Sequence, residues 1–185
     1  MMQGLDASFA ADFFIGYHAR AGSPTGVLAH TGSSALADVK INGTRVGEAG
    51  MNIFYAASLG VPVVLITGDQ VAVAQARELA SEIEAVEVKE AVGTRAAIYR
   101  PLEETRAAIR AAAERALKNA GLRRPPPLAP PFFFEVTFSS TALADIAEQV
   151  PTVQRVGSHA VTYTTTDFRT GYRLLRVLYR YLNPD

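Results

Sequence analysis

Apolar runs and amphipathic stretches alternate along the first half of the chain. The runs are rich in β-branched or aromatic residues, which favours strands, whereas the stretches between them place apolar residues at helical spacing. The expected strands are residues 13–17, residues 61–67 and one that begins at residue 86, and the expected helices are residues 47–60 and 70–83. This alternation of strands and helices predicts a layered α/β fold.

Two connections in this half carry local signals of their own. Asn42 and Gly43 lie inside residues 39–46, and both residue types accept a positive φ, so the sequence predicts a type I′ hairpin there. Residues 18–33 are rich in Gly, Ser, Thr and Pro and predict an ordered loop. A loop of that length within a compact domain is usually functional.

The second half begins with the clearest helix of the sequence, residues 101–119. Pro101 stands at its start, acidic residues occupy its first turn, and Gly121 follows its end. A stiff Pro-rich connector over residues 121–131 comes next. The last elements are expected strands at residues 132–138 and 160–166 and expected helices at residues 140–149 and 167–182.

Together these elements predict an α/β fold, a layered α/β/α arrangement with a mixed sheet followed by a smaller α/β unit. The expected boundaries place the core in residues 1–120, the connector in residues 121–131 and the smaller unit in residues 132–185. One compact domain over residues 1–185 is the alternative, because a length of 185 residues suits one domain or one domain and part of another.

Composition narrows the possible classes of function. Lys and Arg total 18 and Asp and Glu total 18, so the formal net charge is zero and nucleic-acid binding is not expected. The absence of Cys excludes disulfides, thiolate zinc sites and a cysteine nucleophile. The sequence has no apolar run long enough for a membrane span and no signal-peptide pattern at its start, so we expect a cytoplasmic protein.

Three polar side chains are candidates for a metal site. His18 ends the first predicted strand, His30 follows the Gly-rich loop, and Glu48 begins a predicted helix. Imidazole and carboxylate together suit zinc or a similar divalent ion. No pair has the spacing that puts two ligands on one helix face, so structural interpretations stay open. The histidines could be satisfied at a strand end and in a loop, and Glu48 could complement the helix dipole.

Other polar residues point less clearly to chemistry. Asp69 follows a predicted parallel strand, where α/β proteins bind ligands, but it is equally placed to cap the next helix. His159 follows Gly157 and is typical of a turn. Ser33 lies near His30 without the base and acid pattern of a serine hydrolase. Dinucleotide-binding, P-loop and nucleophile-elbow motifs do not occur in the sequence.

Several blocks of the sequence resemble the DppA-type zinc D-aminopeptidases. These blocks are GYHARAGSPTGVLAHT (residues 16–31), INGTRVGEAGMN (41–52), VPVVLITGD (61–69), VKEAVGTRAA (88–97) and YTTTDF (163–168). Their order and intervals agree with that family, and the likeness extends over residues 3–182. The resemblance therefore implies a zinc-dependent peptidase.

The resemblance also implies roles for individual residues. It makes His18 and Glu48 zinc ligands and His30 the catalytic histidine, which binds no metal. Members of the family bind two zinc ions and release N-terminal D-amino acids, D-Ala in particular, from short peptides by a metal-activated water. They assemble as homodecamers of stacked rings. In this reaction His30 would pass a proton to the leaving amine or stabilise the oxyanion.

One departure from the family pattern leaves other functions open. The family draws further zinc ligands from a D-x-E-G block and an N-D-S-H block, and neither occurs in this sequence, which resembles the part after those blocks. We therefore expect either a piece of a longer protein or a shortened relative. One alternative function is a non-catalytic assembly or binding subunit with an incomplete metal site. The other is a related metal amidohydrolase that acts on a non-peptide amide.

Overall fold

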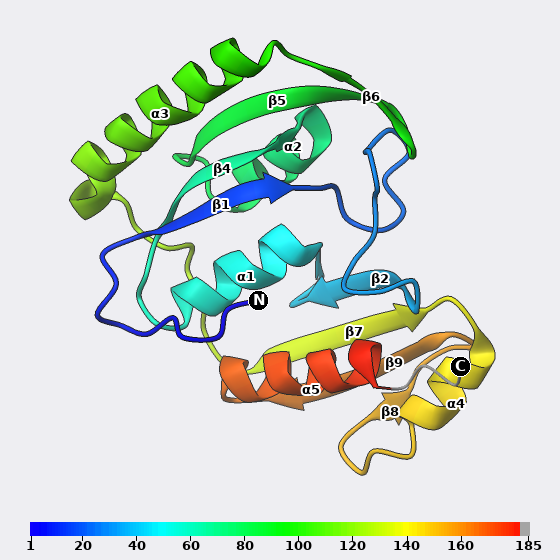
Figure 1. Cartoon of the computed structure of the whole chain (residues 1–185). Helices are drawn as coiled ribbons and strands as arrows, with labels where there is room; N and C mark the ends of the chain where they lie inside the picture. The colour runs from blue at the N-terminus through cyan, green and yellow to red at the C-terminus, as the bar shows by residue number, and fades with distance from the viewer. Residues whose placement is uncertain (182–185) are drawn as a thin grey trace. The chain divides into compact units, whose positions relative to one another are not determined.

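The chain folds into two compact units in the computed structural model, which describes residues 1–181 (Figure 1). The first unit contains residues 1–19, 23–29 and 49–128. The second unit contains residues 20–22, residues 30–48 and the chain from residue 129 onward. Among the described residues, no helix has both the length and the apolar character that a membrane span needs.

A mixed four-stranded sheet organises the first unit. Its strands, in the order β1-β4-β5-β6, are β1 (Asp12–Tyr17), β4 (Val63–Asp69), β5 (Glu84–Gly93) and β6 (Ala96–Tyr99). β1, β4 and β5 run parallel, and β6 returns antiparallel to β5. The three strands predicted for this half of the chain are confirmed, whereas β6 has no counterpart among the predicted elements.

Two helices cover the sheet of the first unit. They are α2 (Gln70–Leu79) and α3 (Leu102–Asn119), with the 3-10 turn η1 (Ala120–Leu122) after α3. Helix α1 (Glu48–Ala57) precedes β4 in the chain. Figure 1 shows α2 and α3 on opposite sides of the sheet. Every residue of β4 is buried, as expected for a parallel strand covered on both faces. Ala112 and Ala116 of α3 pack in one cluster with Leu65 of β4, because small side chains let the helix approach the sheet.

β1 is less buried than its apolar sequence predicts. Phe14 is buried, but Ile15 is 57% exposed. The reason is the position of β1 at the edge of the sheet, where β4 is its hydrogen-bonding partner within the described residues. A run of apolar residues therefore marks the strand correctly and overstates its burial.

The second unit is built on a five-stranded antiparallel sheet. Its strands, in the order β3-β2-β7-β9-β8, are β2 (Leu36–Ile41), β3 (Thr44–Arg45), β7 (Phe132–Phe138), β8 (Gln154–Arg155) and β9 (Ala160–Thr165). The helices α4 (Thr141–Ala147) and α5 (Phe168–Arg180) pack against β7 and β9. Burial alternates along β7, where Phe134 stacks on Tyr163 of β9 and contacts Phe168 of α5. One face of the sheet thus carries an aromatic core.

The predicted hairpin forms, and it belongs to the sheet of the second unit. Asn42 and Gly43 have φ values of 49° and 79°, the positive values that a type I′ turn requires. β2 pairs antiparallel with β7, and Val39 lies opposite Val136 in that pairing. Opposed residues share one face of a sheet, so the hairpin buries its apolar side in the aromatic core.

The boundaries of the two units differ from the predicted domain boundaries. Residues 30–48 join the second unit because β2 pairs with β7, whereas the sequence placed them in a core over residues 1–120. The predicted division into a core over residues 1–120, a connector over residues 121–131 and a unit over residues 132–185 stays a prediction. The ends of the last predicted helix and of the last predicted unit, residues 182–185, lie outside the described residues.

Candidate metal and catalytic site

His30 and Glu48, two of the three predicted site residues, meet in the second unit. His30 Nε2 lies 3.4 Å from Glu48 Oε1. The His30 side chain is 45% exposed and the Glu48 side chain 12% exposed, so the imidazole is open to solvent beside a mostly covered carboxylate. Glu48 begins α1, and a Cβ added to the preceding Gly47 would lie 2.6 Å from the Cβ of Arg20. The start of α1 is therefore packed tightly against the chain at Arg20.

A backbone amide binds the same carboxylate. The N–H of Gly32 donates to Glu48 Oε1 at 2.8 Å. The neighbouring Thr31 is buried, and its Oγ1 accepts a hydrogen bond from the N–H of Ala21 at 3.0 Å. Glu48 Oε1 thus faces one N–H donor and one imidazole nitrogen, which fixes the direction of the carboxylate. Gly32 was not identified from the sequence, because every residue type except proline has a backbone N–H. The position of a glycine near His30 was the one feature that could have indicated it.

His18 lies in the first unit, directly after β1. Its side chain is half-buried, and its Nδ1 lies 3.0 Å from the carbonyl oxygen of Ala19. A carbonyl oxygen only accepts, so Nδ1 carries a proton in this hydrogen bond, and in the neutral ring the lone pair is then on Nε2. Nε2 is therefore the ring nitrogen suited to a metal ion, and a carbonyl partner on the other nitrogen is common in metal-binding histidines.

Asp69 anchors the loop between the two histidines inside the first unit. Its Oδ2 accepts a hydrogen bond from the N–H of Val27 at 3.1 Å. Its Oδ1 accepts from two N–H groups in the first turn of α2, and the side chain is fully buried. The next loop residue, Leu28, donates its N–H to the carbonyl oxygen of Thr94 at 2.7 Å. Asp69 thus takes the capping role that the sequence allowed, and it also holds the loop.

Ser33 and His159 take structural positions. His159 Nδ1 lies 2.9 Å from the hydroxyl of Ser158 in the turn before β9. Ser33 Oγ donates to the carbonyl oxygen of Tyr179 at 2.9 Å and accepts from the N–H of Ala35 at 3.2 Å. The Ser33 hydroxyl thus both donates to and accepts from backbone groups, which is typical of a structural residue.

Tyr179 of α5 lies beside this site and was not singled out from the sequence. Its ring packs against Gly32, and its side chain is buried. Burial raises the pKa of the Tyr179 hydroxyl; the positive charge of Arg176 opposes that rise, and the negative charge of Glu48 adds to it. The sequence pattern gives a tyrosine on an amphipathic helix, which is typical of a core residue, so no signal distinguished it.

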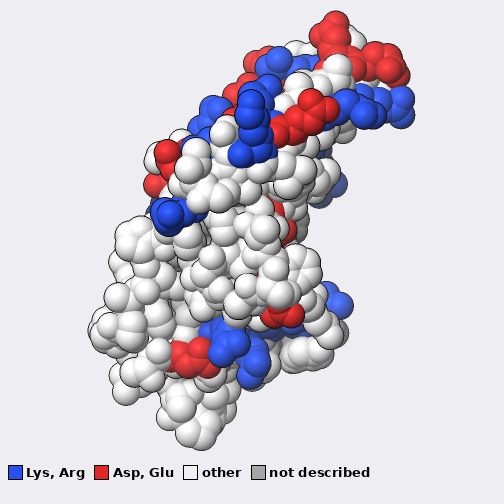
Figure 2. Space-filling model, turned by 90° about the vertical axis from the view of Figure 1, so that its left-hand side faces the viewer, with Lys and Arg blue, Asp and Glu red and all other residues white. Residues whose placement is uncertain are grey.

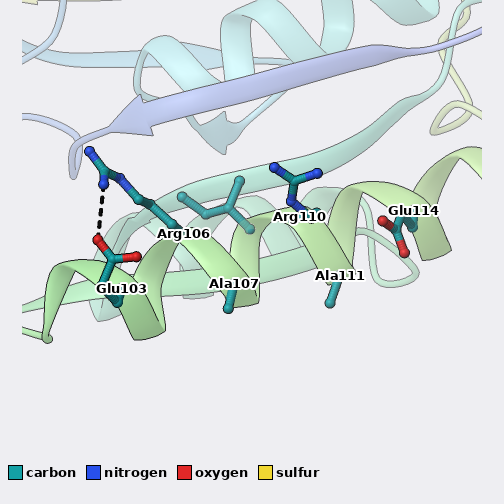
Figure 3. A pocket seen from close by; sticks show the side chains of 7 residues that line it. Glu103, Arg106, Ala107, Arg110, Ala111 and Glu114 are labelled. Atoms are coloured by element: carbon teal, nitrogen blue, oxygen red, sulfur yellow. Dashed lines mark hydrogen bonds and ion pairs between the residues drawn. The ribbon is translucent and has the colours of Figure 1, made fainter.

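An open hollow along α3 is lined by acidic, basic and apolar side chains and lacks the histidines of the candidate site (Figure 3). All of its lining residues belong to α3, and Glu103 and Arg106 among them form an ion pair at 3.0 Å. Figure 2 shows acidic and basic side chains gathered over the end of the first unit where α3 lies. A solvated helix face of mixed charge accounts for this hollow, and it is not a candidate site.

The donor chemistry of the predicted residues fits zinc. Zinc takes imidazole nitrogens and carboxylate oxygens as ligands in proteins. Glu48 of the second unit presents a carboxylate oxygen, and the first unit presents Nε2 of His18. These donors suit zinc or a similar divalent ion better than calcium or magnesium, which prefer oxygen ligands alone.

Comparisons with known sequences agree with one another. The family model Peptidase M55, described as D-aminopeptidase, matches residues 1–177. A curated D-aminopeptidase from Bacillus subtilis (strain 168) is 29% identical over 181 residues, which cover 96% of this chain. The chain spans 65% of the length of that relative.

A solved structure shares the fold. It is the Zn-dependent D-aminopeptidase DppA from Bacillus subtilis, described as a self-compartmentalizing protease. The match has a TM-score of 0.93 and 27% sequence identity, and it covers 100% of this chain and 68% of that one. The mixed α/β fold class predicted from the sequence is therefore confirmed.

Proposed function

Because the chain belongs to the Peptidase M55 family of D-aminopeptidases, we propose that it acts as a zinc-dependent aminopeptidase. The reaction is the release of N-terminal D-amino acids, of the D-Ala type, from short peptides. One observation carries the proposal: His30 lies against Glu48, whose Oε1 is held by the Gly32 N–H, within the residues that the family model matches. The predicted resemblance to this family is confirmed, and the activity, substrate and metal are inferred from it.

We assign His18 and Glu48 as zinc ligands and His30 as the acid–base residue. Close packing of Gly47 on Arg20 supports this assignment. Glu48 directly follows Gly47, and His18 stands two residues before Arg20, so covalent geometry keeps the Cα of His18 within about 8 Å of the Cα of Arg20. The relative named as Zn-dependent supports the choice of metal.

Two groups of this chain have separate tasks in the proposed reaction. The Gly32 N–H orients the Glu48 carboxylate, and His30 transfers a proton. Zinc, when bound, supplies Lewis-acid polarisation of the peptide carbonyl and activates the attacking water. The Gly32 N–H holds the Glu48 carboxylate in one direction while peptides enter and leave. His30 is open to solvent and therefore to substrate, and its imidazole gives a proton to the departing amine as the peptide bond breaks.

Metal content and D-peptide hydrolysis test the proposal together. We expect the chain to bind zinc and to hydrolyse D-alanyl-D-alanine faster than L-alanyl-L-alanine. His30→Ala should keep the zinc and lower kcat by about 10²–10⁴-fold, because the imidazole transfers a proton and holds no metal. Elemental analysis measures the first quantity and steady-state kinetics the second.

His159→Ala is the matched control, because His159 is a histidine in the turn before β9 with a hydroxyl partner. It should leave zinc content and kcat unchanged. A wild-type chain that holds no zinc and releases no D-amino acid contradicts the peptidase and favours the non-catalytic subunit. Zinc binding with hydrolysis of non-peptide amides alone favours the related amidohydrolase.

We further propose that the protein self-associates, with a homodecamer as the expected assembly. The relative described as self-compartmentalizing supports this proposal. Val92, Ile98 and Tyr99 supply a candidate contact surface, since they are exposed apolar side chains on β5 and on β6, an edge strand of the first unit's sheet. Light scattering should find a species ten times the 19.8 kDa chain mass, and a monomer contradicts the proposal.

A cytoplasmic location completes the proposed function. The cysteine-free sequence is compatible with the reducing conditions of the cytoplasm. Fractionation of cells that produce the protein tests it, and recovery in the medium or in the membrane fraction contradicts it.

A further inference from the structure

Helix α5 meets the loop that carries His30 at a glycine of the second unit. Gly32 has a φ of 71°, and a Cβ added there would lie 2.8 Å from Cδ2 of Tyr179. The Tyr179 residue is only 7% exposed, so its ring is enclosed where it touches the loop. This contact leaves no room for a side chain at Gly32, and the left-handed backbone there disfavours one as well.

The main chain of Tyr179 holds the next residue of the loop. Ser33 Oγ donates to the carbonyl oxygen of Tyr179 at 2.9 Å. Tyr179 lies in the last turn of α5, where carbonyl groups lack a partner within the helix, so this hydrogen bond also completes the helix end. Ring and carbonyl of one residue therefore hold Gly32 and Ser33 at once.

These two contacts set the direction of the Gly32 amide. Its N–H donates to Glu48 Oε1 at 2.8 Å, and the same oxygen lies 3.4 Å from His30 Nε2. We propose that Tyr179 is a positioning residue of this site, which keeps the Gly32 N–H on Glu48 Oε1 and so fixes the carboxylate beside His30. The inference rests on the proposed function, since it concerns the same zinc-binding carboxylate.

Two substitutions at Tyr179 separate the ring from the hydroxyl. Tyr179→Leu removes the aromatic face that contacts Gly32, whereas Tyr179→Phe keeps it. Partners behind a metal ligand typically change metal affinity by 10–100-fold, so we expect the Leu variant to bind zinc about 10–100-fold more weakly. The Gly32 amide should also exchange faster with solvent in the Leu variant. The Phe variant should keep wild-type values of both, as measured by chelator competition and hydrogen exchange.

Phe168→Leu is the matched control for a loss of stability alone. Phe168 lies on the same helix, is 2% exposed, and packs its ring on Phe132 and Phe134 at centroid distances of 5.4 Å and 5.7 Å. We expect this variant to lower the unfolding midpoint while zinc affinity and Gly32 exchange stay at wild-type values. A Tyr179→Leu variant that lowers only the unfolding midpoint overturns the proposal.

Hydrogen exchange also separates this inference from the proposed function. If the wild-type chain binds zinc and Tyr179→Leu binds it equally well, the positioning role is wrong and the peptidase proposal stands. If the wild-type chain binds no zinc, the peptidase proposal is wrong, and exchange at Gly32 alone decides the positioning role. Faster exchange in the Leu variant then supports that role, and unchanged exchange overturns it.

Discussion

Helices α1 and α2 both begin beside an acidic residue, and the two carboxylates bind very different partners. Asp69 is fully buried, and its oxygens accept three backbone N–H groups, two from α2 and one from Val27. Glu48 accepts the N–H of Gly32, from a separate loop, and lies beside the imidazole of His30. One carboxylate therefore completes its own helix, and the other is directed at neighbouring segments.

Side-chain length and position account for the difference. Asp69 is the N-cap residue of α2, where a short side chain reaches the N–H groups of the first turn. Glu48 is the first residue of α1, and the residue before it is Gly47, which has no side chain to cap the helix. Because Gly47 packs on Arg20, a capping residue does not fit there. An acidic residue at the N-cap position therefore accepts the N–H groups of its own helix. An acidic residue one position later, at the first helical residue, can bind neighbouring segments instead.

Glu48→Gln gives the largest expected effect and tests the functional half of this contrast. The amide keeps an oxygen for the Gly32 N–H but removes the charge that binds zinc. We expect loss of zinc and a fall in kcat/KM of more than about 100-fold. Residues that hydrogen-bond a metal ligand typically change activity by about 10–100-fold, and loss of the ligand itself should cost more. The free energy of unfolding without zinc should change by less than about 1 kcal/mol.

Glu135→Gln is the matched control for this substitution. Glu135 belongs to the same unit and pairs with Lys40 at 2.6 Å on the surface of the sheet. The variant should keep its zinc and its kcat/KM, because surface ion pairs contribute little. Retention of both quantities by Glu48→Gln as well contradicts the functional role of Glu48.

Asp69→Ala tests the structural role of Asp69 and should lower the stability of the fold. Three N–H groups lose their acceptor, so we expect the free energy of unfolding to fall by about 2–4 kcal/mol in denaturant titrations. Asp69→Asn keeps a carbonyl oxygen for the helix and should lose less. A fall below about 1 kcal/mol in the Ala variant contradicts the anchoring role.

Asp167→Ala should have the smallest effect, since Asp167 caps α5 at the surface. Its carboxylate accepts from the Arg169 N–H at 3.2 Å and the Thr170 hydroxyl at 2.7 Å. Loss of an exposed cap costs about 1 kcal/mol. The Thr170 hydrogen bond holds the pKa of Asp167 below its usual value, so the stabilisation is complete above about pH 4 and is lost as pH falls through the lowered pKa.

Denaturant titrations of wild type and Asp167→Ala at about pH 6 and about pH 3 measure this dependence. The difference in unfolding free energy between the two proteins should shrink at the lower pH. A difference that grows as pH falls contradicts the assignment.

Local patterns predict the first unit well because its elements are formed by nearby residues. β4 is a continuous apolar run, and α3 carries its own apolar positions. In the second unit, the Asn42–Gly43 turn is likewise a local feature, because it is fixed by residue type. The pairing of β2 with β7 is not local: Lys40 and Glu135, which meet across it, stand 95 residues apart. A hairpin sequence shows which face is apolar but not which sheet will cover it.

The candidate site shows a similar division. Residue types suggested metal chemistry at His18, His30 and Glu48, and the family resemblance gave each residue its role; those roles stay proposals. The sequence could not predict the Gly32 N–H or the Tyr179 ring, because one is a backbone group and the other comes from a distant helix. Both depend on tertiary packing, which a single sequence does not display.

The late return of the chain to the second sheet has a consequence for protein synthesis. β2 leaves the ribosome about 95 residues before β7, a delay of roughly 5–20 s at typical elongation rates. During that time the apolar side of the hairpin has no cover from β7, and such surfaces are the ones that chaperones bind. Tyr179 is synthesised later still. His30 and Glu48 are therefore present in the nascent chain long before the residue that we propose fixes the Glu48 carboxylate beside His30.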